Sequence, residues 1–303
     1  MASVDQFMGR ISIVIPNRGM SSLVRTVQSI LQSNVEPCEI IVWDKAGHLP
    51  SSADIALVTD ACTVVKGDEN PLQARILGTK CAKGEYVLFL DSDQTVDPSL
   101  ISELSQVGTI CAVVPETVEG RGFSARAMGD KKLLSYLQFQ ANPALTYPVA
   151  PRLYRRHELI EAFEYLSAQM PLCALWQHED SVLFWAIVTR QNKPLESIVY
   201  FARSHIANES ISLVEIIKKA GIYGNNRGNF TRMLQRKDLP EIKNILRLLS
   251  KMDAWRPPVD PTGRLWPFAA AYDLVRVPTY AGGYLYGRWL ARIFASKSPM
   301  KVG

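Results

Sequence analysis

Short hydrophobic runs recur along the first half of the chain, and each ends at polar residues. The runs over residues 11–15, 39–43, 61–65 and 86–90 are rich in β-branched or aromatic residues and predict buried strands. Residues 20–31 and 72–81 lie between these runs and have the spacing of helices. Strands that alternate with helices are typical of βαβ units, so the pattern predicts an α/β fold with a mainly parallel sheet.

Polar residues follow each predicted strand directly. Pro16-Asn17-Arg18 follows the first strand, and the next three strands are followed by Asp44, Asp68 and Asp91. In parallel sheets, ligands bind at the carboxyl ends of the strands. We therefore expect these residues to converge on one edge of the sheet.

The pattern changes in the second half of the chain. Residues 110–114 predict one more strand, residues 155–170 and 178–190 predict helices, and residues 116–150 have weak periodicity. From about residue 211 the pattern is helical and basic, and a proline-rich stretch precedes an aromatic tail. We expect one domain over residues 8–210 and a helical C-terminal extension over residues 211–303.

Composition narrows the class of protein. The chain has 303 residues, 47% of them hydrophobic, which is ordinary globular composition. The net charge of +5 is mild. It fits an anionic nucleotide substrate or an anionic membrane surface, and it does not by itself indicate nucleic acid. We expect no nucleic-acid partner.

The cysteines indicate a compartment. There are five, with no CxxC pair, so neither a zinc site nor a disulfide framework is predicted. Free cysteines in apolar stretches are typical of a reducing environment. No signal peptide is predicted, and no apolar stretch reaches the roughly 18 residues of a membrane span. We expect a cytoplasmic protein, with the cytoplasmic face of a membrane as the more specific location.

The strongest candidate chemistry lies at Asp91-Ser92-Asp93. Two carboxylates one residue apart, at the end of a hydrophobic strand, can share a divalent cation and a ribose or phosphate. Mg²⁺ prefers one or two protein carboxylates together with substrate phosphate oxygens. The alternative is a turn that begins with Asp, but the preceding strand favours a functional site.

A second acidic pair, Glu179-Asp180, precedes the apolar run that begins at Val182. One interpretation makes Asp180 a general base that deprotonates an acceptor hydroxyl, with Glu179 orienting it or meeting the acceptor. The other interpretation is an acid pair that stabilises the positive end of a helix.

Four further side chains are candidates, each with a structural alternative. His205 can be a ligand of Mn²⁺-like ions or a structural histidine. Asp44 and Asp68 can accept hydrogen bonds from a nucleobase and ribose, or form turns. Arg75 can pair with a diphosphate or lie on a solvated helix face.

The order of these segments resembles that of family 2 glycosyltransferases, which have the GT-A fold. The resemblance covers roughly residues 10–230 and rests on these segments together: Ile13-Val14-Ile15-Pro16-Asn17-Arg18, Ile41-Val42-Trp43-Asp44, Gly67-Asp68-Glu69-Asn70-Pro71, Ala74-Arg75, the run from Ala82 to Asp93, the run from Ala150 to Arg156, Glu179-Asp180, His205 and the run from Tyr223 to Gly228. Two positions depart from the family pattern. Lys45-Ala46-Gly47 replaces an Asp-Gly-Ser-like sequence, and Ile76 stands where Asn is common.

The resemblance implies a catalytic domain with a GT-A, Rossmann-like mixed sheet flanked by helices. It also implies an inverting transfer from a nucleoside-diphosphate sugar, UDP-sugar favoured over GDP-sugar, to an acceptor hydroxyl. Asp93, Asp91 and His205 would hold Mg²⁺ or Mn²⁺, and Asp180 would be the base assisted by Glu179. The implied donor-binding residues are Pro16, Asn17, Arg18, Asp44, Asp68, Arg75, Asp91, Ser92 and a basic loop containing Arg227.

The tail mixes aromatic residues with arginines over residues 264–292. This composition suits a membrane interface, and the alternative is a helical extension that packs on the catalytic domain. Membrane contact would favour a lipid-linked acceptor over a small-molecule or glycan acceptor.

Two other functions compete with sugar transfer. A nucleotidyltransferase also uses paired aspartates, but it needs a glycine-rich loop after the first strand, and Pro16-Asn17-Arg18-Gly19-Met20 has one glycine. A non-catalytic binding domain would need no base.

Overall fold

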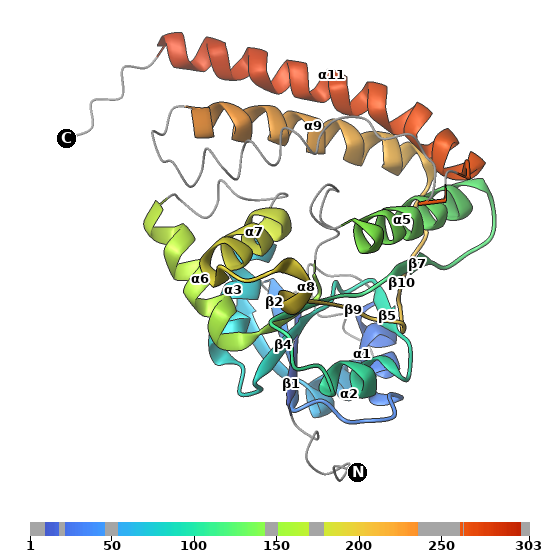
Figure 1. Cartoon of the computed structure of the whole chain (residues 1–303), viewed down its shortest axis with the longest axis vertical. Helices are drawn as coiled ribbons and strands as arrows, with labels where there is room; N and C mark the ends of the chain where they lie inside the picture. Colours follow the sequence, from blue (N-terminus) through green and yellow to red (C-terminus); the bar gives the residue numbers. More distant parts are fainter. Residues whose placement is uncertain are drawn as a thin grey trace. The chain divides into compact units, whose positions relative to one another are not determined.

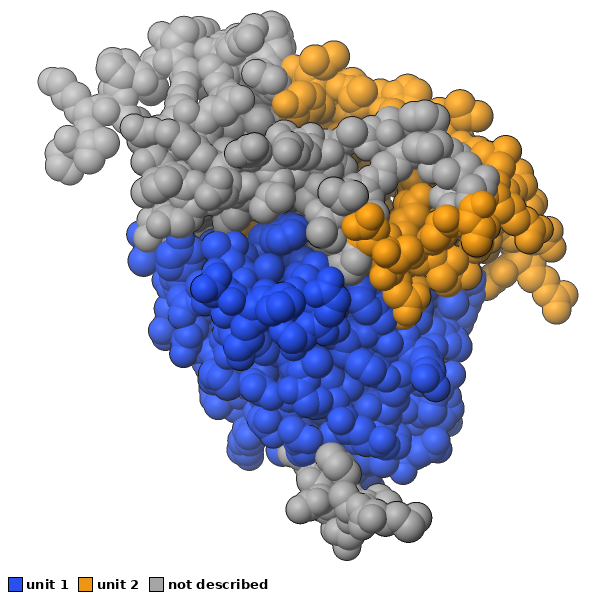
Figure 2. Space-filling view, viewed as in Figure 1, with its two compact units in different colours: residues 1–119, 148–173, 183–209 blue, residues 120–147, 174–182, 210–303 orange. Residues whose placement is uncertain are grey.

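The structure, a computed structural model, describes residues 10–17, 22–45, 54–142, 151–169, 179–235, 261–262 and 264–297. The chain divides into two compact units (Figure 2). The first contains residues 1–119, 148–173 and 183–209, and the second contains residues 120–147, 174–182 and 210–303. The sequence predicted a single boundary at residue 210. The second unit also contains residues 120–147 and 174–182, which lie before that boundary.

A seven-stranded sheet forms the centre of the first unit, in the order β3-β2-β1-β4-β8-β6-β9 (Figure 1). The strands are β1 (Ile11–Asn17), β2 (Glu39–Lys45), β3 (Thr63–Gly67), β4 (Tyr86–Phe89), β6 (Cys111–Val113), β8 (Leu153–Arg155) and β9 (Val199–Phe201). The strands β1 to β4 run parallel, and β8 is antiparallel to both β4 and β6. The predicted mainly parallel mixed sheet is confirmed.

Helices of the first unit pack on this sheet and on one another. They are α1 (Leu23–Leu31), α2 (Asp54–Ala61), α3 (Pro71–Cys81), α4 (Leu100–Ser105), α6 (Arg156–Gln169) and α8 (Leu195–Ile198), while α7 (Glu179–Gln191) has residues in both units. α3 contacts β1 and β2. This approach is close at Gly78, where a Cβ atom would lie 2.5 Å from Val14 Cγ1.

A second, smaller sheet includes β5, the next strand after β4 along the chain. It consists of β5 (Gln94–Val96), β10 (Ile206–Asn208) and β7 (Glu116–Val118), with β10 in the middle. β10 runs antiparallel to β5 and parallel to β7. This sheet was not predicted, because its strands have three residues each and are too short to show a period.

The second unit contains the helices α5 (Phe123–Ala141), α9 (Leu213–Gln235) and α11 (Pro267–Lys297). α11 contacts both α9 and α5, and Figure 1 shows α9 and α11 side by side. None of the helices in the described part of the chain is both long and apolar enough to cross a membrane.

One predicted element of this unit is wrong. Residues 223–228 were expected to form a basic loop, and they lie inside α9. Gly224 serves packing instead. A Cβ atom on Gly224 would lie 2.0 Å from the backbone oxygen of Tyr280, so a residue without a side chain is what lets α11 approach.

Candidate active site

The carboxyl ends of β1 and β2 bring two polar side chains together. Asn17 pairs with Asp44 in the strand register, and Asn17 Nδ2 donates to Asp44 Oδ1 at 2.7 Å. Both residues are buried, with exposures of 1% and 0%. The second oxygen, Asp44 Oδ2, is buried and has no hydrogen-bond partner among the described residues. Such an acceptor is costly unless a ligand satisfies it, so this atom indicates a binding position for a donor group.

Arg75 joins this edge from α3. The helix begins in a capping box, in which Asn70 Oδ1 accepts from Gln73 N at 2.9 Å, and Pro71 occupies the first turn. This start places Arg75 in the second turn. Its Nη2 donates to Asp91 Oδ1 at 2.7 Å, and the Arg75 side chain is only 8% exposed.

A second arginine approaches the same carboxylate. Arg152, just before β8, lies with Nη1 3.5 Å from Asp91 Oδ2. Its Nε and Nη2 donate at 2.8 Å and 2.5 Å to one oxygen of Glu116, at the start of β7. The Asp91 carboxylate therefore lies between two guanidinium groups, and its side chain stays 39% exposed.

The contacts continue from Glu116 back to Asp91. Glu116 Oε2 accepts from Asn208 Nδ2 at 3.2 Å, and Asn208 Oδ1 accepts from Gln94 Nε2 at 2.9 Å. Gln94 Oε1 then accepts from the backbone N–H of Asp91 at 2.8 Å. Asp91, Arg152, Glu116, Asn208 and Gln94 thus form a closed ring of polar contacts, which we call the Asp91 ring.

Ser92 and Asp93 follow in a tight turn. Thr26 Oγ1 on α1 donates to the Ser92 carbonyl at 3.0 Å, and Gln94 N donates to the Asp91 carbonyl at 3.1 Å. The Asp93 carbonyl accepts from Glu209 N at 3.3 Å, and the Asp93 side chain is partly exposed. Hydrogen bonds to the carbonyl groups of Asp91, Ser92 and Asp93 therefore hold this turn in place.

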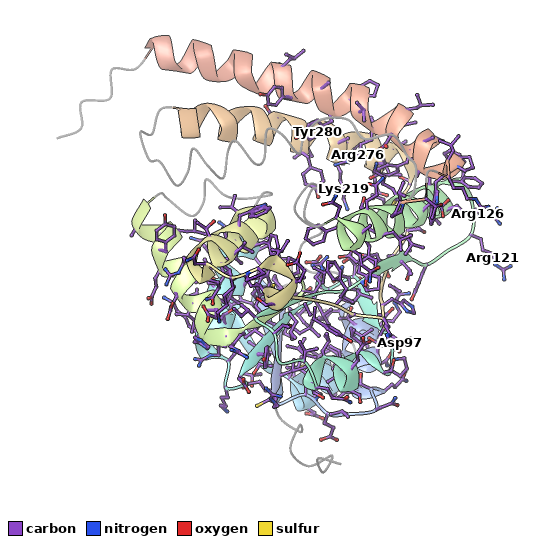
Figure 3. All side chains as sticks on the ribbon, viewed as in Figure 1. Asp97, Arg121, Arg126, Lys219, Arg276 and Tyr280 are labelled. Atoms are coloured by element: carbon purple, nitrogen blue, oxygen red, sulfur yellow. The ribbon has the colours of Figure 1, made fainter. Side chains whose placement is uncertain are left out.

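His205 lies beside a different aspartate. Its Nδ1 is 3.6 Å from Asp97 Oδ2, and its carbonyl accepts from Asp97 N at 3.0 Å. Hydrogen bonds from the Ser99 hydroxyl and then from its backbone N–H lower the pKa of Asp97, with a smaller contribution from His205 (Asp97 is labelled in Figure 3). Glu209 is the residue opposite Asp93, and it lies four positions after His205, with the three residues of β10 between them, which is roughly 13 Å of extended chain. The structure does not bring His205 to Asp93.

The remaining predicted site residues are placed less fully. Pro16 lies on β1 opposite Trp43, and Asp68 is exposed just after β3. Arg18 lies outside the described residues. Glu179 and Asp180 open α7 as predicted, and Arg227 lies within α9, but the side chains of these three residues are outside the described part.

The metal prediction has one direct structural test. Within the described ranges, no three His, Cys, Asp or Glu side chains are grouped closely enough to enclose a metal ion. A cation at Asp91-Ser92-Asp93 would therefore need oxygens from a substrate, as Mg²⁺ sites on diphosphates commonly do.

Sequence reasoning missed the Asp91 ring apart from Asp91. Glu116, Arg152 and Asn208 lie far apart along the chain, and no motif links them to Asp91. The usable signal was limited to Arg152, which precedes the Leu153-Tyr154-Arg155-Arg156 run.

Comparison with known proteins gives matches to part of this chain. Residues 12–151 match the model of glycosyl transferase family 2. Glycosyltransferase GlyG of Streptococcus pneumoniae serotype 4 is 36% identical over 104 residues, which is 32% of this chain and 34% of that protein. The match thus spans about a third of GlyG.

Two solved structures align with most of this chain. TarS 1–349 of S. aureus, in complex with UDP-GlcNAc, aligns with a TM-score of 0.51 and 14% identity over 93% of this chain and 91% of that chain. The mannosyltransferase PcManGT from Pyrobaculum calidifontis, in complex with GDP-Man and Mn²⁺, aligns with a TM-score of 0.47 and 15% identity, covering 97% and 81% of the two chains. The likeness to TarS confirms the GT-A architecture expected from the sequence.

Asn17, Asp44, Arg75 and Asp91 all lie within the residues that the family model matches. Over residues 12–151, the chain matches glycosyl transferase family 2.

Proposed function

We propose that this chain is an inverting glycosyltransferase that moves a sugar from a nucleoside-diphosphate sugar to an acceptor hydroxyl. The buried Asp44 Oδ2 is the observation that carries the proposal. It is an acceptor without a described partner, at the same sheet edge as the Arg75–Asp91 pair. A nucleobase N–H would satisfy Asp44, and a diphosphate would find the guanidinium of Arg75 nearby.

The same atom favours UDP over GDP. Uracil presents one N–H on its pairing edge, whereas guanine presents two adjacent donors that suit both oxygens of a carboxylate. Asp44 Oδ1 already accepts from Asn17, and Oδ2 is the oxygen with no partner among the described residues. A base with one donor, such as uracil, can bond to Oδ2 without competing with Asn17 for Oδ1.

The proposed cation, Mg²⁺ or Mn²⁺, lies at Asp93 with substrate diphosphate oxygens. Arginines contact both oxygens of Asp91, so we assign Asp91 to the ribose or to a water-mediated contact. When bound, such a cation neutralises charge on the leaving diphosphate. The structure does not place His205 beside Asp93, and its role as a third ligand stays a prediction.

The proposed base is Asp180, in the first turn of α7. Its carboxylate would remove the acceptor proton during attack on the anomeric carbon, and one displacement inverts the configuration. We expect Asp180→Asn to bind UDP normally and to lose transfer by about 10²–10⁴-fold, which is the usual contribution of a general base. Normal transfer by this variant would exclude Asp180 as the base.

One assay separates the competing functions. The full chain would be incubated with Mn²⁺ and a panel of UDP- and GDP-sugars and, separately, with nucleoside triphosphates and sugar phosphates, and the released products identified. Release of nucleoside diphosphate supports glycosyl transfer and identifies the donor. Release of pyrophosphate from a nucleoside triphosphate would instead support the nucleotidyltransferase, and binding without any release would support the non-catalytic domain.

A peripheral membrane contact is the second part of the proposal. Among the described residues, every large hydrophobic side chain that stays exposed lies in the second unit, with the exception of Leu31. On α11, Leu274, Val277 and Leu285 recur at helical spacing with exposures of 77%, 39% and 67%. This apolar face suits a bilayer interface, and it supports a lipid-linked acceptor at the cytoplasmic face of a membrane.

The opposite side of α11 faces the unit itself. There Arg276 lies between the rings of Tyr272 and Tyr280, 5.9 Å from each centroid (Figure 3).

Flotation of the full chain with phosphatidylglycerol vesicles tests the proposed membrane contact of the exposed α11 face. We expect Leu274→Glu to reduce the bound fraction and Leu31→Glu, on α1, to leave it unchanged. Equal flotation by both variants would count against the α11 face.

A further inference from the structure

The structure assigns a positioning role to Arg152: held by Glu116, it fixes the carboxylate of Asp91 for contact with the nucleoside diphosphate of the donor. This inference deepens the proposed function and rests on it. None of the comparisons or sequence motifs assigned a role to either residue.

The first support is the geometry at Glu116. Arg152 donates through Nε and Nη2 to the same oxygen, Glu116 Oε1, so its guanidinium plane is set by two bonds. The third nitrogen, Nη1, then lies toward Asp91 Oδ2 at 3.5 Å. A guanidinium held by two nitrogens presents the third in a fixed direction, which a flexible ammonium group cannot do.

Burial and charge provide the second support. The side chains of Arg75, Arg152 and Glu116 are 8%, 10% and 12% exposed, while that of Asp91 is 39% exposed. Two cations and two anions balance one another, with the most accessible of them being Asp91. Buried charges are tolerated when they are paired, so the arrangement keeps two guanidinium groups beside Asp91 without a net buried charge.

The exposure of Asp91 indicates what the arrangement is for. Each of the two arginines contacts one oxygen of its carboxylate. Because the Asp91 side chain is 39% exposed, a ribose hydroxyl or a metal-bound water can reach it. Fixing both oxygens before the donor arrives reduces the ordering cost of binding.

The Asp91 ring explains why the fixation extends beyond one pair. Asn208 holds Glu116, and Gln94 joins Asn208 to the backbone N–H of Asp91. The side chain and the backbone of Asp91 are therefore held by the same set of contacts. Loss of Arg152 removes the contact to Asp91 Oδ2, while the contact of Arg75 with Oδ1 and the backbone contact through Gln94 remain.

The test uses a charge-balanced double variant, Arg152→Gln with Glu116→Gln, in the full chain. Removing both partners leaves no unpaired buried charge at Glu116, so we expect a melting temperature close to that of the wild type. UDP binding with Mn²⁺, measured by calorimetry, should weaken about tenfold, the size of one lost charge-assisted contact. The KM for the donor should rise by a similar factor, with a much smaller change in kcat.

The chain provides a matched control. Arg10 also donates through Nε and Nη2 to one oxygen, Glu85 Oε2, at 3.0 Å and 2.8 Å. This pair precedes β1 and β4, at the amino edge of the sheet. The double variant Arg10→Gln with Glu85→Gln should bind UDP as the wild type does.

The outcomes are distinct. If the wild type binds no nucleoside diphosphate, the proposed function fails. If the wild type binds UDP and the Arg152/Glu116 double variant binds it equally well, the role of Arg152 is overturned while the function stands. If the double variant does not fold, Arg152→Lys replaces it, because it keeps the charge and loses the two-nitrogen contact with Glu116. Unchanged UDP binding by a folded Arg152→Lys would equally overturn the inference.

Discussion

The amino and carboxyl edges of the main sheet both bury polar side chains, but the two edges differ in whether the buried polar atoms have hydrogen-bond partners among the described residues. At the amino edge, Ser12 is fully buried, and its hydroxyl donates to Glu39 Oε1 and accepts from Gly84 N, both at 2.8 Å. At the carboxyl edge, Asp44 is equally buried, and Oδ2 has no partner among the described residues. Burial alone therefore does not distinguish a functional edge. The distinguishing feature is a buried acceptor that none of the described residues satisfies.

The largest expected effect comes from Asp93, at the carboxyl edge. If Asp93 contacts the cation, Asp93→Asn should lower metal-dependent transfer by on the order of 10³-fold, since electrostatic stabilisation of a leaving group is a major part of catalysis. Initial rates with a saturating donor would measure this. Asp97→Asn, on the same strand region, is the control and should keep near wild-type activity. Comparable losses in both variants would show that the effect is structural.

Asp44→Asn should have the next largest effect, and it acts on binding rather than on folding. Asn retains an acceptor for Asn17 but presents an amide N–H₂ where Oδ2 lies, opposite a nucleobase donor. We expect UDP affinity to fall by about 10- to 100-fold, as for a lost hydrogen bond to a charged group. The free energy of unfolding should not fall, because a buried charge is removed. A large loss of stability with unchanged UDP affinity would mean that Asp44 serves the fold.

Ser12→Ala tests the other edge with the opposite expectation. The change removes the buried partner of the Gly84 N–H, while Glu39 Oε1 keeps its hydrogen bond from Lys83 N at 2.6 Å. We expect a loss of about 1–3 kcal/mol in the free energy of unfolding, measured by urea denaturation. UDP affinity should stay at the wild-type value. Weakened nucleotide binding by a folded Ser12→Ala variant would break the contrast between the two edges.

The parts that sequence predicted are those with a local signal. The strands β1, β2 and β4 were found because their residues form continuous apolar runs, and Asp44 and Asp91 were found because each follows such a run. The Asn17–Asp44 contact lies at the sheet edge where the sequence predicted that these residues converge. Local sequence also predicted the helix that begins at Glu179.

The parts that sequence missed depend on contacts between distant segments. Arg152 and Glu116 are 36 residues apart, and Gln94 and Asn208 are 114 residues apart. The strands β5, β7 and β10, which carry Gln94, Glu116 and Asn208, have three residues each and are too short to show a periodic pattern. The Gly224 segment was misread for a related reason, because a glycine that permits close helix packing has the same sequence signal as a glycine in a loop.

His205 provides a smaller test, of the metal site itself. Because β10 places His205 beside Asp97, we expect His205→Ala to leave the Mn²⁺ concentration for half-maximal transfer unchanged. A titration of activity with Mn²⁺ measures this directly, with Asp93→Asn as the variant that should respond. If the Mn²⁺ concentration for half-maximal transfer rose tenfold or more in the His205→Ala variant, the result would support the ligand role that the sequence predicts. It would also require a different register between β5 and β10.

The smallest expected effect concerns Asp97 and pH. Hydrogen bonds from Ser99 lower the pKa of Asp97 from its ordinary value of 3.8. A carboxylate with a lowered pKa stabilises the fold above its unfolded value and loses that contribution as the pH falls through the lowered pKa. Asp97 is partly exposed, so Asp97→Asn should cost only a few tenths of a kcal/mol at neutral pH. The difference in unfolding free energy between wild type and variant should shrink below pH 3.8. If this difference in unfolding free energy stayed constant as the pH falls, packing rather than charge would hold the chain just after β5. Asp97 would then contrast more clearly with the carboxyl edge of the main sheet, where we expect charge to determine function.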